Sequence, residues 1–397
     1  MSHGHAVLGP SSSSRWMNCT ASPDFIESLN LPEDEGSFPS REGTHCHSVM
    51  ELLVLNNFKV RGGDVFLRHE QVAEEVNGGA ELYDTAQMIE DMEPLMDHLR
   101  VLDISYPDLE IYVEEKVTLE PITTDVWGTA DLILYSRAGD FVQVIDLKYG
   151  RVYVEEVANP QLTLYFIGAL LSTLRNRVKG FPARAQFVIF QPRAGGEKLR
   201  EWNVSKDYIS DFVDNKLTPC LSGTDVFKTG DWCEYCPGLL SCKEAKGEMM
   251  KVAETAFESL DDGAAVKDIL DARKMVLALI KAAEERAVQR LTLGKPIEGW
   301  KLVEGKTNRK WNASDDDIID FLRNKAKLKL KDVVVKKIIG IGAAEKMVKA
   351  SKHVDIKELQ DYIIKPVGGP SLAPESDKRP AITAKPFTDI TEGTANE

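Results

Sequence analysis

The chain has 397 residues, of which 43% are hydrophobic, and its formal net charge is −14 at pH 7. This length and composition are typical of two or three domains with a sizeable buried core. The acidic balance argues against non-specific nucleic-acid binding by the chain as a whole, because phosphate affinity comes from Lys and Arg. The sequence has no apolar run of about 18 residues, and its N-terminus lacks the charged and apolar regions of a signal peptide. We therefore expect a soluble, cytoplasmic protein with no membrane contact.

The hydrophobic spacing predicts helices first and strands afterwards. Residues 42–58 and 67–100 have helical spacing, with an interruption near residues 77–79. Three strands are predicted next, with a turn between the last two at residues 139–140, and they cover residues 111–118, 126–135 and 141–148.

A helix follows within residues 156–176, after Pro160, and residues 185–191 are predicted as another strand. Residues 250–293 and 315–366 are helical in spacing. The predicted organisation is a helical N-terminal segment, an α/β core, a helical C-terminal region and a disordered tail, covering residues 1–100, 101–250, 251–366 and 367–397.

The charge is unevenly distributed along the chain. Residues 64–125 contain 17 acidic and three basic residues, whereas residues 301–352 contain 14 basic and seven acidic residues. The basic part includes a run at residues 323–331 and a Gly-Ile-Gly turn at residues 340–342, which weakly resembles a helix–hairpin–helix DNA-binding turn. We expect most of these charges to lie on solvated helix faces, with the basic part as a candidate to hold DNA.

Two predicted strands carry acids that a metal site needs. Asp131 follows Gly128-Thr129-Ala130, and Asp146 and Lys148 lie two residues apart in VIDLKYG. Residues i and i+2 of a strand project on the same face, so Asp146 and Lys148 point together, and Asp131 can lie across from them. Carboxylate oxygens suit Mg²⁺, and a nearby lysine can orient or deprotonate water and neutralise phosphate charge. The alternative is a surface hairpin with a salt bridge, which the apolar neighbours of both acids make less favourable.

The order of these residues resembles the PD-(D/E)XK nucleases of the RecB-like branch. The matching positions are Gly128 to Asp131, Asp146 to Lys148, and Gln161 to Tyr165. The resemblance implies an α/β, restriction-endonuclease-like core, a mixed central sheet flanked by helices, with helical N- and C-terminal additions. It also implies Asp131 and Asp146 as metal ligands and Lys148 as the catalytic lysine.

Gln161 and Tyr165 correspond to residues that contact the DNA or the site in this family. They lie four residues apart, on one face of the predicted helix. Taken without the rest of the pattern, they are equally compatible with a capped helix that buries a tyrosine in the core.

RecB-like nucleases also carry an upstream histidine that binds the metal. His47 in EGTHCHSVME fits this role, and Glu51 shares its helical face. His45 competes with His47 but points elsewhere on a helix. Glu115 is a possible additional acid, with its neighbour Glu114 as the alternative, because only one of them can face the cleft.

Four of the six cysteines are spaced as ligands. Cys233, Cys236 and Cys242 form a C-x2-C-x5-C group, and Cys19 lies far upstream. Four thiolates suit zinc or iron–sulfur by spacing, and ligands are more common than disulfides inside cells.

The resemblance favours iron over Zn²⁺, because a subset of RecB-like nucleases binds a [4Fe–4S] cluster with this arrangement. Such a cluster would link distant parts of the chain, and its loss should loosen the fold. Free thiols are the remaining alternative. Cys46 and Cys220 lie outside the pattern and are expected to be ordinary buried thiols.

The resemblance implies a Mg²⁺- or Mn²⁺-dependent deoxyribonuclease, an exonuclease of phage DNA recombination or processing that hydrolyses phosphodiester bonds with a metal-activated water. The chain also resembles a bacteriophage family with the SSSSRWMNC, EGT-x-x-H and SDKRPAI segments. This implies a bacterial host cytoplasm, with DNA and a phage single-strand-annealing protein as partners. The alternative is a nuclease-like scaffold that binds DNA or a partner without cutting. The sequence leaves open the cleavage polarity, exonuclease or endonuclease action, DNA or RNA preference and oligomeric state.

Overall fold

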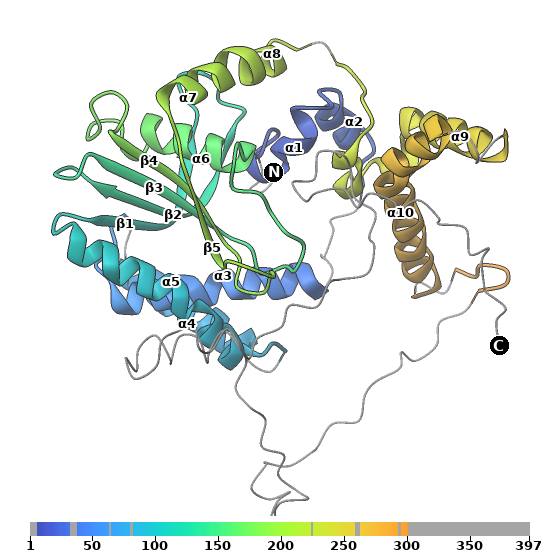
Figure 1. The fold of residues 1–397 in the computed structure, drawn as a ribbon. Coiled ribbons are helices and arrows are strands. Elements are labelled where there is room, and N and C mark those ends of the chain that lie inside the picture. The colour runs from blue at the N-terminus through green and yellow to red at the C-terminus, as the bar shows by residue number, and fades with distance from the viewer. Residues whose placement is uncertain are drawn as a thin grey trace, which may run out of the picture. The chain divides into compact units, whose positions relative to one another are not determined.

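A five-stranded mixed sheet forms the centre of the computed structural model, in the order β1-β2-β3-β4-β5 (Figure 1). β3 and β4 pair in parallel, and the other neighbouring strands are antiparallel. Helix α6 supplies the crossover that a parallel pair requires. The strands are β1 (Glu110–Thr118), β2 (Trp127–Ser136), β3 (Phe141–Leu147), β4 (Arg184–Phe190) and β5 (Leu199–Asn203).

Helices precede the sheet, cover it and follow it in the chain. The α-helices are α1 (Ser13–Trp16), α2 (Ser22–Ser28), α3 (Phe38–Asn57), α4 (Val65–Gly79), α5 (Thr85–Ser105), α6 (Pro160–Leu171), α7 (Lys206–Phe212), α8 (Thr218–Leu221), α9 (Lys243–Glu258) and α10 (Gly263–Thr292). Short 3₁₀ turns occur at Pro10–Ser12, Asp231–Tyr235 and Leu239–Ser241, and a π-helical turn at Val213–Leu217.

The structure describes only part of the chain, and all of that part belongs to one unit, Met1–Val303. The predicted features that lie outside it are the helices at 315–366, the basic run at 323–331, the turn at 340–342 and the tail at 367–397. The described residues are 6–31, 38–62, 65–79, 82–223, 225–258, 263–292 and 295–300.

Both faces of the sheet are covered by helices, because strand residues alternate between two apolar layers. Ile145 and Leu147 of β3 pack in the layer formed with α3, α4 and α5, whereas Val142 and Val144 pack in the layer formed with α6 and α7. Figure 1 shows α3, α4 and α5 along one face and α6 and α7 along the other. The sheet and the helices that cover it therefore form a helix–sheet–helix sandwich.

The start of α6 is fixed by local sequence. Asn159 caps the helix, since its side chain accepts a hydrogen bond of 3.1 Å from the backbone N of Leu162. Pro160 occupies the first helical position, where its missing N–H has no partner to lose. This start determines where Gln161 and Tyr165 lie on the helix.

The predicted α/β class is confirmed, and so are the four predicted strands, whose ends lie close to the predicted ones. β5 was not predicted, because its sequence, LREWN, has little apolar alternation and it pairs with β4 alone. The segment at 250–293 is divided between α9 and α10. The domain boundaries predicted near residues 100 and 250 fall inside α5 and α9. The predicted division of the chain into four segments stays a prediction. None of the described helices is both long and apolar enough to span a bilayer.

Helix α5 offers a matched test of the packing. Leu99 is 0% exposed and Ile104 is 81% exposed on the same helix. We expect Leu99→Ala to lower the free energy of unfolding by about 2–5 kcal/mol, because it leaves a cavity against the sheet. Ile104→Ala should change it by no more than about 0.5 kcal/mol. Urea denaturation followed by circular dichroism measures both, and equal losses would contradict this packing.

Candidate metal centre

The candidate centre lies where β2 and β3 separate. Their pairing ends at Leu132↔Ile145, and the next residues on the two strands are Asp131 and Asp146. Oδ2 of Asp131 accepts a hydrogen bond of 2.6 Å from the backbone N of Leu147. The carboxylate thus takes the position of a strand-to-strand hydrogen bond, which fixes its orientation through the backbone.

Glu114 on β1 lies opposite Asp131, between the pairs Val113↔Leu132 and Glu115↔Ala130. Its φ of +46° lies in the left-handed region, which residues other than glycine rarely adopt. The alternation changes here: Val113 packs toward α3, α4 and α5, whereas Val117 packs toward α6. The local conformation therefore decides which acid of the Glu114-Glu115 pair meets the helix α3.

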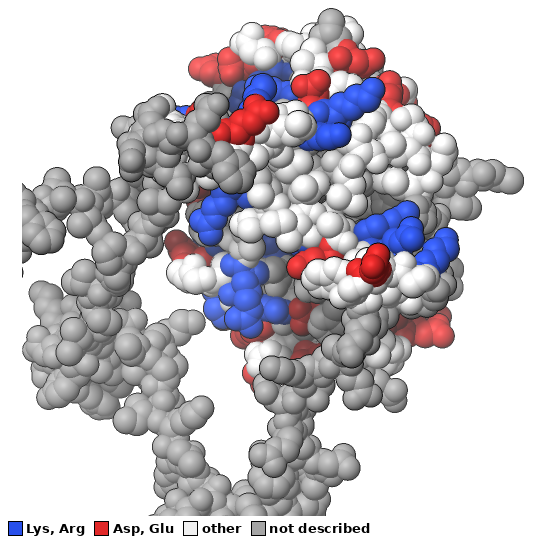
Figure 2. Space-filling view, turned by 90° about the vertical axis from the view of Figure 1, so that its right-hand side faces the viewer, with Lys and Arg blue, Asp and Glu red and all other residues white. Residues whose placement is uncertain are grey.

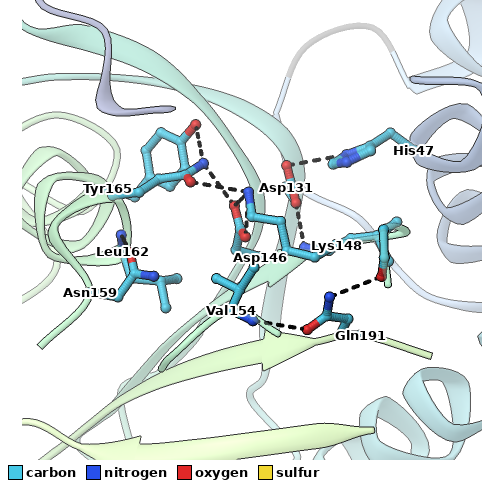
Figure 3. Close-up of polar contacts among 12 residues, drawn as sticks. His47, Asp131, Asp146, Lys148, Val154, Asn159, Leu162, Tyr165 and Gln191 are labelled. Atoms are coloured by element: carbon cyan, nitrogen blue, oxygen red, sulfur yellow. Dashed lines mark hydrogen bonds and ion pairs between the residues drawn. The ribbon is translucent and has the colours of Figure 1, made fainter. Parts of the chain in front are cut away.

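His47 of α3 completes the centre. Its Nδ1 lies 3.3 Å from Oδ1 of Asp131 and 3.4 Å from Oε1 of Glu114. Ligand atoms of the three residues all lie within 4.8 Å of one another. The His47 side chain is 31% exposed and that of Glu114 is 23% exposed, so solvent reaches the centre. Figure 3 shows Asp131 between His47 on one side and Asp146 and Tyr165 on the other.

Asp146 and Lys148 are held together by helix α6. Nζ of Lys148 donates to Oδ1 of Asp146 and to Oε1 of Gln161, both at 3.1 Å. Nε2 of Gln161 donates to Oδ1 of Asp146 at 2.9 Å and to the hydroxyl of Tyr165 at 3.3 Å. Oδ2 of Asp146 is buried and lies 2.8 Å from Nζ, but makes no hydrogen bond among the described residues.

The four charged groups shift one another's pKa values. Burial lowers the pKa of His47, but Asp131 and Glu114 outweigh burial and hold it well above its ordinary value. Burial raises the pKa of Asp131, but His47 and then Lys148 outweigh burial and lower it. Burial raises the pKa of Asp146 to about 6, and Lys148 offsets only part of this. The aspartates likewise raise the pKa of Lys148 against the effect of burial. A cation bound by His47 therefore has to displace a proton.

The loop between Lys148 and α6 is fixed by two buried side chains, Gln191, which directly follows β4, and Arg200 of β5. Nε2 of Gln191 donates to the carbonyl oxygens of Gly150, at 2.9 Å, and Val152, at 2.7 Å. Its Oε1 accepts from the backbone N of Val154 at 3.2 Å (Figure 3), and Nη2 of Arg200 donates to the carbonyl of Val154 at 2.8 Å. These contacts fix the part of the loop that directly follows Lys148.

The other predicted candidates lie elsewhere. Glu51 is paired with Arg68, and burial raises its pKa. Nε2 of His45 lies 3.0 Å from Oγ1 of Thr85. Oε1 of Glu115 accepts a hydrogen bond of 3.3 Å from Thr173, so Glu114 rather than Glu115 joins His47. Strand alternation could signal that one of the two acids faces the site, but not which one.

The four cysteines of the predicted ligand pattern line one cavity. Cys19 comes from the segment after α1, and Cys233, Cys236 and Cys242 come from the segment before α9. Among the described residues, no three cysteine sulfurs lie within 4.8 Å of one another. Cys46 is fully buried in the core, whereas the half-buried Cys220 donates through Sγ to the carbonyl of Met17 at 3.4 Å.

Backbone contacts join the two cysteine segments. The backbone N of Ala21 donates to the carbonyl of Val226 at 3.3 Å, and the backbone N of Val226 donates to Oγ1 of Thr20 at 3.0 Å. The rings of Phe25 and Phe227 meet edge to face with centroids 5.4 Å apart. The cavity is therefore built by segments about 200 residues apart in the chain.

Neighbouring glutamates of β1 provide a test of the metal centre. We expect Glu114→Gln to weaken Mn²⁺ binding more than about 10-fold, because it removes a ligand oxygen beside His47 and Asp131. Glu115→Gln should bind Mn²⁺ as the wild type does. Isothermal titration calorimetry of the two variants measures the difference. Equal affinities would show that this carboxylate does not bind the ion.

The family model described as "Protein of unknown function (DUF2800)" matches residues 5–380. The match covers most of the chain, so the protein belongs to the DUF2800 family.

Proposed function

We propose that this DUF2800 protein is a divalent-metal-dependent DNA nuclease of the PD-(D/E)XK superfamily, related to the RecB-like branch. The observation that carries the proposal is the meeting of His47, Glu114 and Asp131 beside the Asp146–Lys148 pair. The mixed sheet with helices on both faces is compatible with such a core. Exonuclease action in phage DNA recombination or processing, with a single-strand-annealing partner, is part of the same proposal.

The donor atoms fit a Mg²⁺ or Mn²⁺ ion. His47, Glu114 and Asp131 would hold it through one imidazole nitrogen and two carboxylates. Carboxylates suit both ions, and the imidazole favours Mn²⁺ over Mg²⁺. Oδ2 of Asp146 is buried and ion-paired with Nζ of Lys148 at 2.8 Å, but makes no hydrogen bond, so a lone pair remains for a further ligand role.

When bound, such an ion polarises the phosphate and lowers the pKa of a water molecule. The protein's own residues then have separate tasks. Lys148, whose pKa is raised by the two aspartates, carries its proton and places a positive charge where phosphate charge grows. Gln161 holds both Lys148 and Asp146, so it positions them, and the Tyr165 hydroxyl is held beside them.

DNA affinity is expected to come from selected surface groups rather than a uniform basic surface. Figure 2 shows Lys and Arg in separate groups on one face, among neutral and acidic side chains. A protein that neutralises few phosphates has a shallow salt dependence of binding. We therefore expect DNA binding by this protein to depend weakly on salt, with its phosphate contacts made mainly at the metal centre.

The wide spacing of the cysteine sulfurs supports an iron–sulfur cluster over a zinc ion in this proposal. A zinc ion with Zn–S distances of about 2.3 Å in a tetrahedron requires sulfurs about 3.8 Å apart. No three of the cysteine sulfurs lie within 4.8 Å of one another, and a [4Fe–4S] cluster places each thiolate on a different iron. Cys19, Cys233, Cys236 and Cys242 would hold the cluster, which would link the N-terminal segment to the segment before α9.

DNA cleavage tests the proposed activity. We expect the wild type to degrade end-labelled linear duplex DNA with Mg²⁺ or Mn²⁺, and EDTA to abolish this. Asp146→Asn and Lys148→Ala should each reduce the rate by at least about 100-fold, because the first removes the carboxylate that pairs with Lys148 and the second removes the positive charge beside the reacting phosphate. Lys179→Ala, at an exposed lysine after α6, should cleave normally.

Labels at the 5′ and 3′ ends and a circular substrate separate the directions of exonuclease action from endonuclease action. If the wild type and Asp146→Asn were equally inert on single- and double-stranded DNA with several metals, while DNA still bound, the protein would be a non-cleaving binding protein.

Loss of a cluster ligand is expected to destabilise the fold. Cys236→Ser should lose iron and lower the melting temperature by more than about 5 °C, because the linkage closes a very long loop. Cys220→Ser, outside the cavity, should keep its iron and its melting temperature. Iron analysis and calorimetry of anaerobically purified protein measure both effects. An iron-free wild type with an unchanged Cys236→Ser variant would exclude the cluster.

A further inference from the structure

Buried polar atoms without hydrogen bonds mark both candidate sites. Within the described ranges these atoms are Nε of Arg15, Oγ of Ser22 and Oδ2 of Asp146. A buried donor without an acceptor is unfavourable, so a group outside the protein chain is expected to pair with Arg15 and with Ser22, whereas Oδ2 of Asp146 already lies 2.8 Å from Nζ of Lys148. Asp146 lies at the metal centre, whereas Arg15 and Ser22 both line the cysteine cavity.

Arg15 brings a positive charge to the cavity. Its Nη1 makes one long contact, 3.5 Å, with the carbonyl of Tyr235. In the part of the chain that the structure describes, Arg15 forms no ion pair with a carboxylate. The guanidinium cannot lose its proton in a protein, so burying it without an anion is unfavourable. The acidic groups that face it are the thiols of Cys236 and Cys19.

Ser22 brings a second donor, independent of Arg15. It is 2% exposed at the first position of α2, and its backbone N donates to the carbonyl of Cys19 at 2.9 Å. The backbone of Ser22 is therefore tied to a cavity cysteine, whereas its hydroxyl makes no hydrogen bond in the described chain. A hydroxyl can rotate toward an acceptor placed in the cavity.

Because the cavity is lined largely by apolar side chains, a negatively charged group inside it needs the hydrogen bonds of Arg15 and Ser22 for its stability. Phe25, Phe227, Trp232 and Leu239 form much of the lining. In such apolar surroundings, charge interactions are stronger than in water. Four thiolates that bind a cluster would be negatively charged, and they line the same cavity as the unpaired donors of Arg15 and Ser22.

We propose that Arg15 and Ser22 donate hydrogen bonds to the sulfur atoms of a [4Fe–4S] cluster held by the four cysteines, and that Arg15 raises the cluster's reduction potential. This inference rests on the iron–sulfur part of the proposed function. One-electron reduction adds one negative charge to the cluster, and a positive charge and sulfur hydrogen bonds stabilise the reduced form. Arg15 and Ser22 are positioning and tuning residues, not ligands.

The test is a redox titration of the full-length, anaerobically purified protein with iron and sulfide analysis. Arg15→Met removes the charge at similar length, Arg15→Lys keeps the charge without the planar fork, and Ser22→Ala removes the hydroxyl. Arg137→Gln, at an exposed arginine after β2, is the control. We expect the midpoint potential to fall most in Arg15→Met, less in Ser22→Ala and Arg15→Lys, and not at all in Arg137→Gln.

Unchanged potentials in Arg15→Lys and Ser22→Ala, together with either an unchanged potential or loss of fold in Arg15→Met, would overturn the inference. A wild type that holds zinc or no metal would overturn it as well. DNA cleavage is measured on the same samples. If the wild type cleaves DNA but the potentials are unchanged, the nuclease proposal stands and this inference fails. If the potentials shift but no DNA is cleaved, this inference stands and the nuclease proposal fails.

Discussion

The hydrogen bond from the backbone of Leu147 to the carboxylate of Asp131 determines the geometry of the whole site. It forms where β2 and β3 stop pairing, so the two strands diverge with an aspartate on each. Once Asp131 is held by the backbone, one carboxylate oxygen remains for His47, and Asp146 is left to pair with Lys148. The site thus lies where β2 and β3 stop pairing, and side-chain hydrogen bonds there replace those of the strand backbones.

Support for this geometry comes from three directions around the sheet. Helix α3 positions His47 from one face and α6 positions Gln161 from the other. Gln191, directly after β4, and Arg200 of β5 fix the connecting loop. α3 packs in one apolar layer and α6 in the other, and β4 and β5 contribute side chains to both layers. A buried charge is tolerated here because rigid neighbours supply its partners, which is how proteins keep ionisable groups at functional positions.

The sequence could predict much of the frame and some of the site. The strands followed from their apolar patterns, and the common direction of Asp146 and Lys148 followed from their spacing of two. The choice between Glu114 and Glu115 could not be made, because the left-handed conformation of Glu114 shifts the alternation of β1. Arg15 and Ser22 carry no motif, and their importance depends on burial without a partner, which only the folded arrangement reveals.

The contacts between residues 20–25 and 226–238 have a consequence for the order of folding during synthesis. The first of these segments leaves the ribosome more than 200 residues before the second, and all five strands are synthesised between them. The sheet can therefore form before Cys233, Cys236 and Cys242 have been synthesised. Closure of the cavity then comes late, so the nascent chain has a stage in which the candidate metal centre is formed while the thiols of the later cavity are still open to solvent and oxidants.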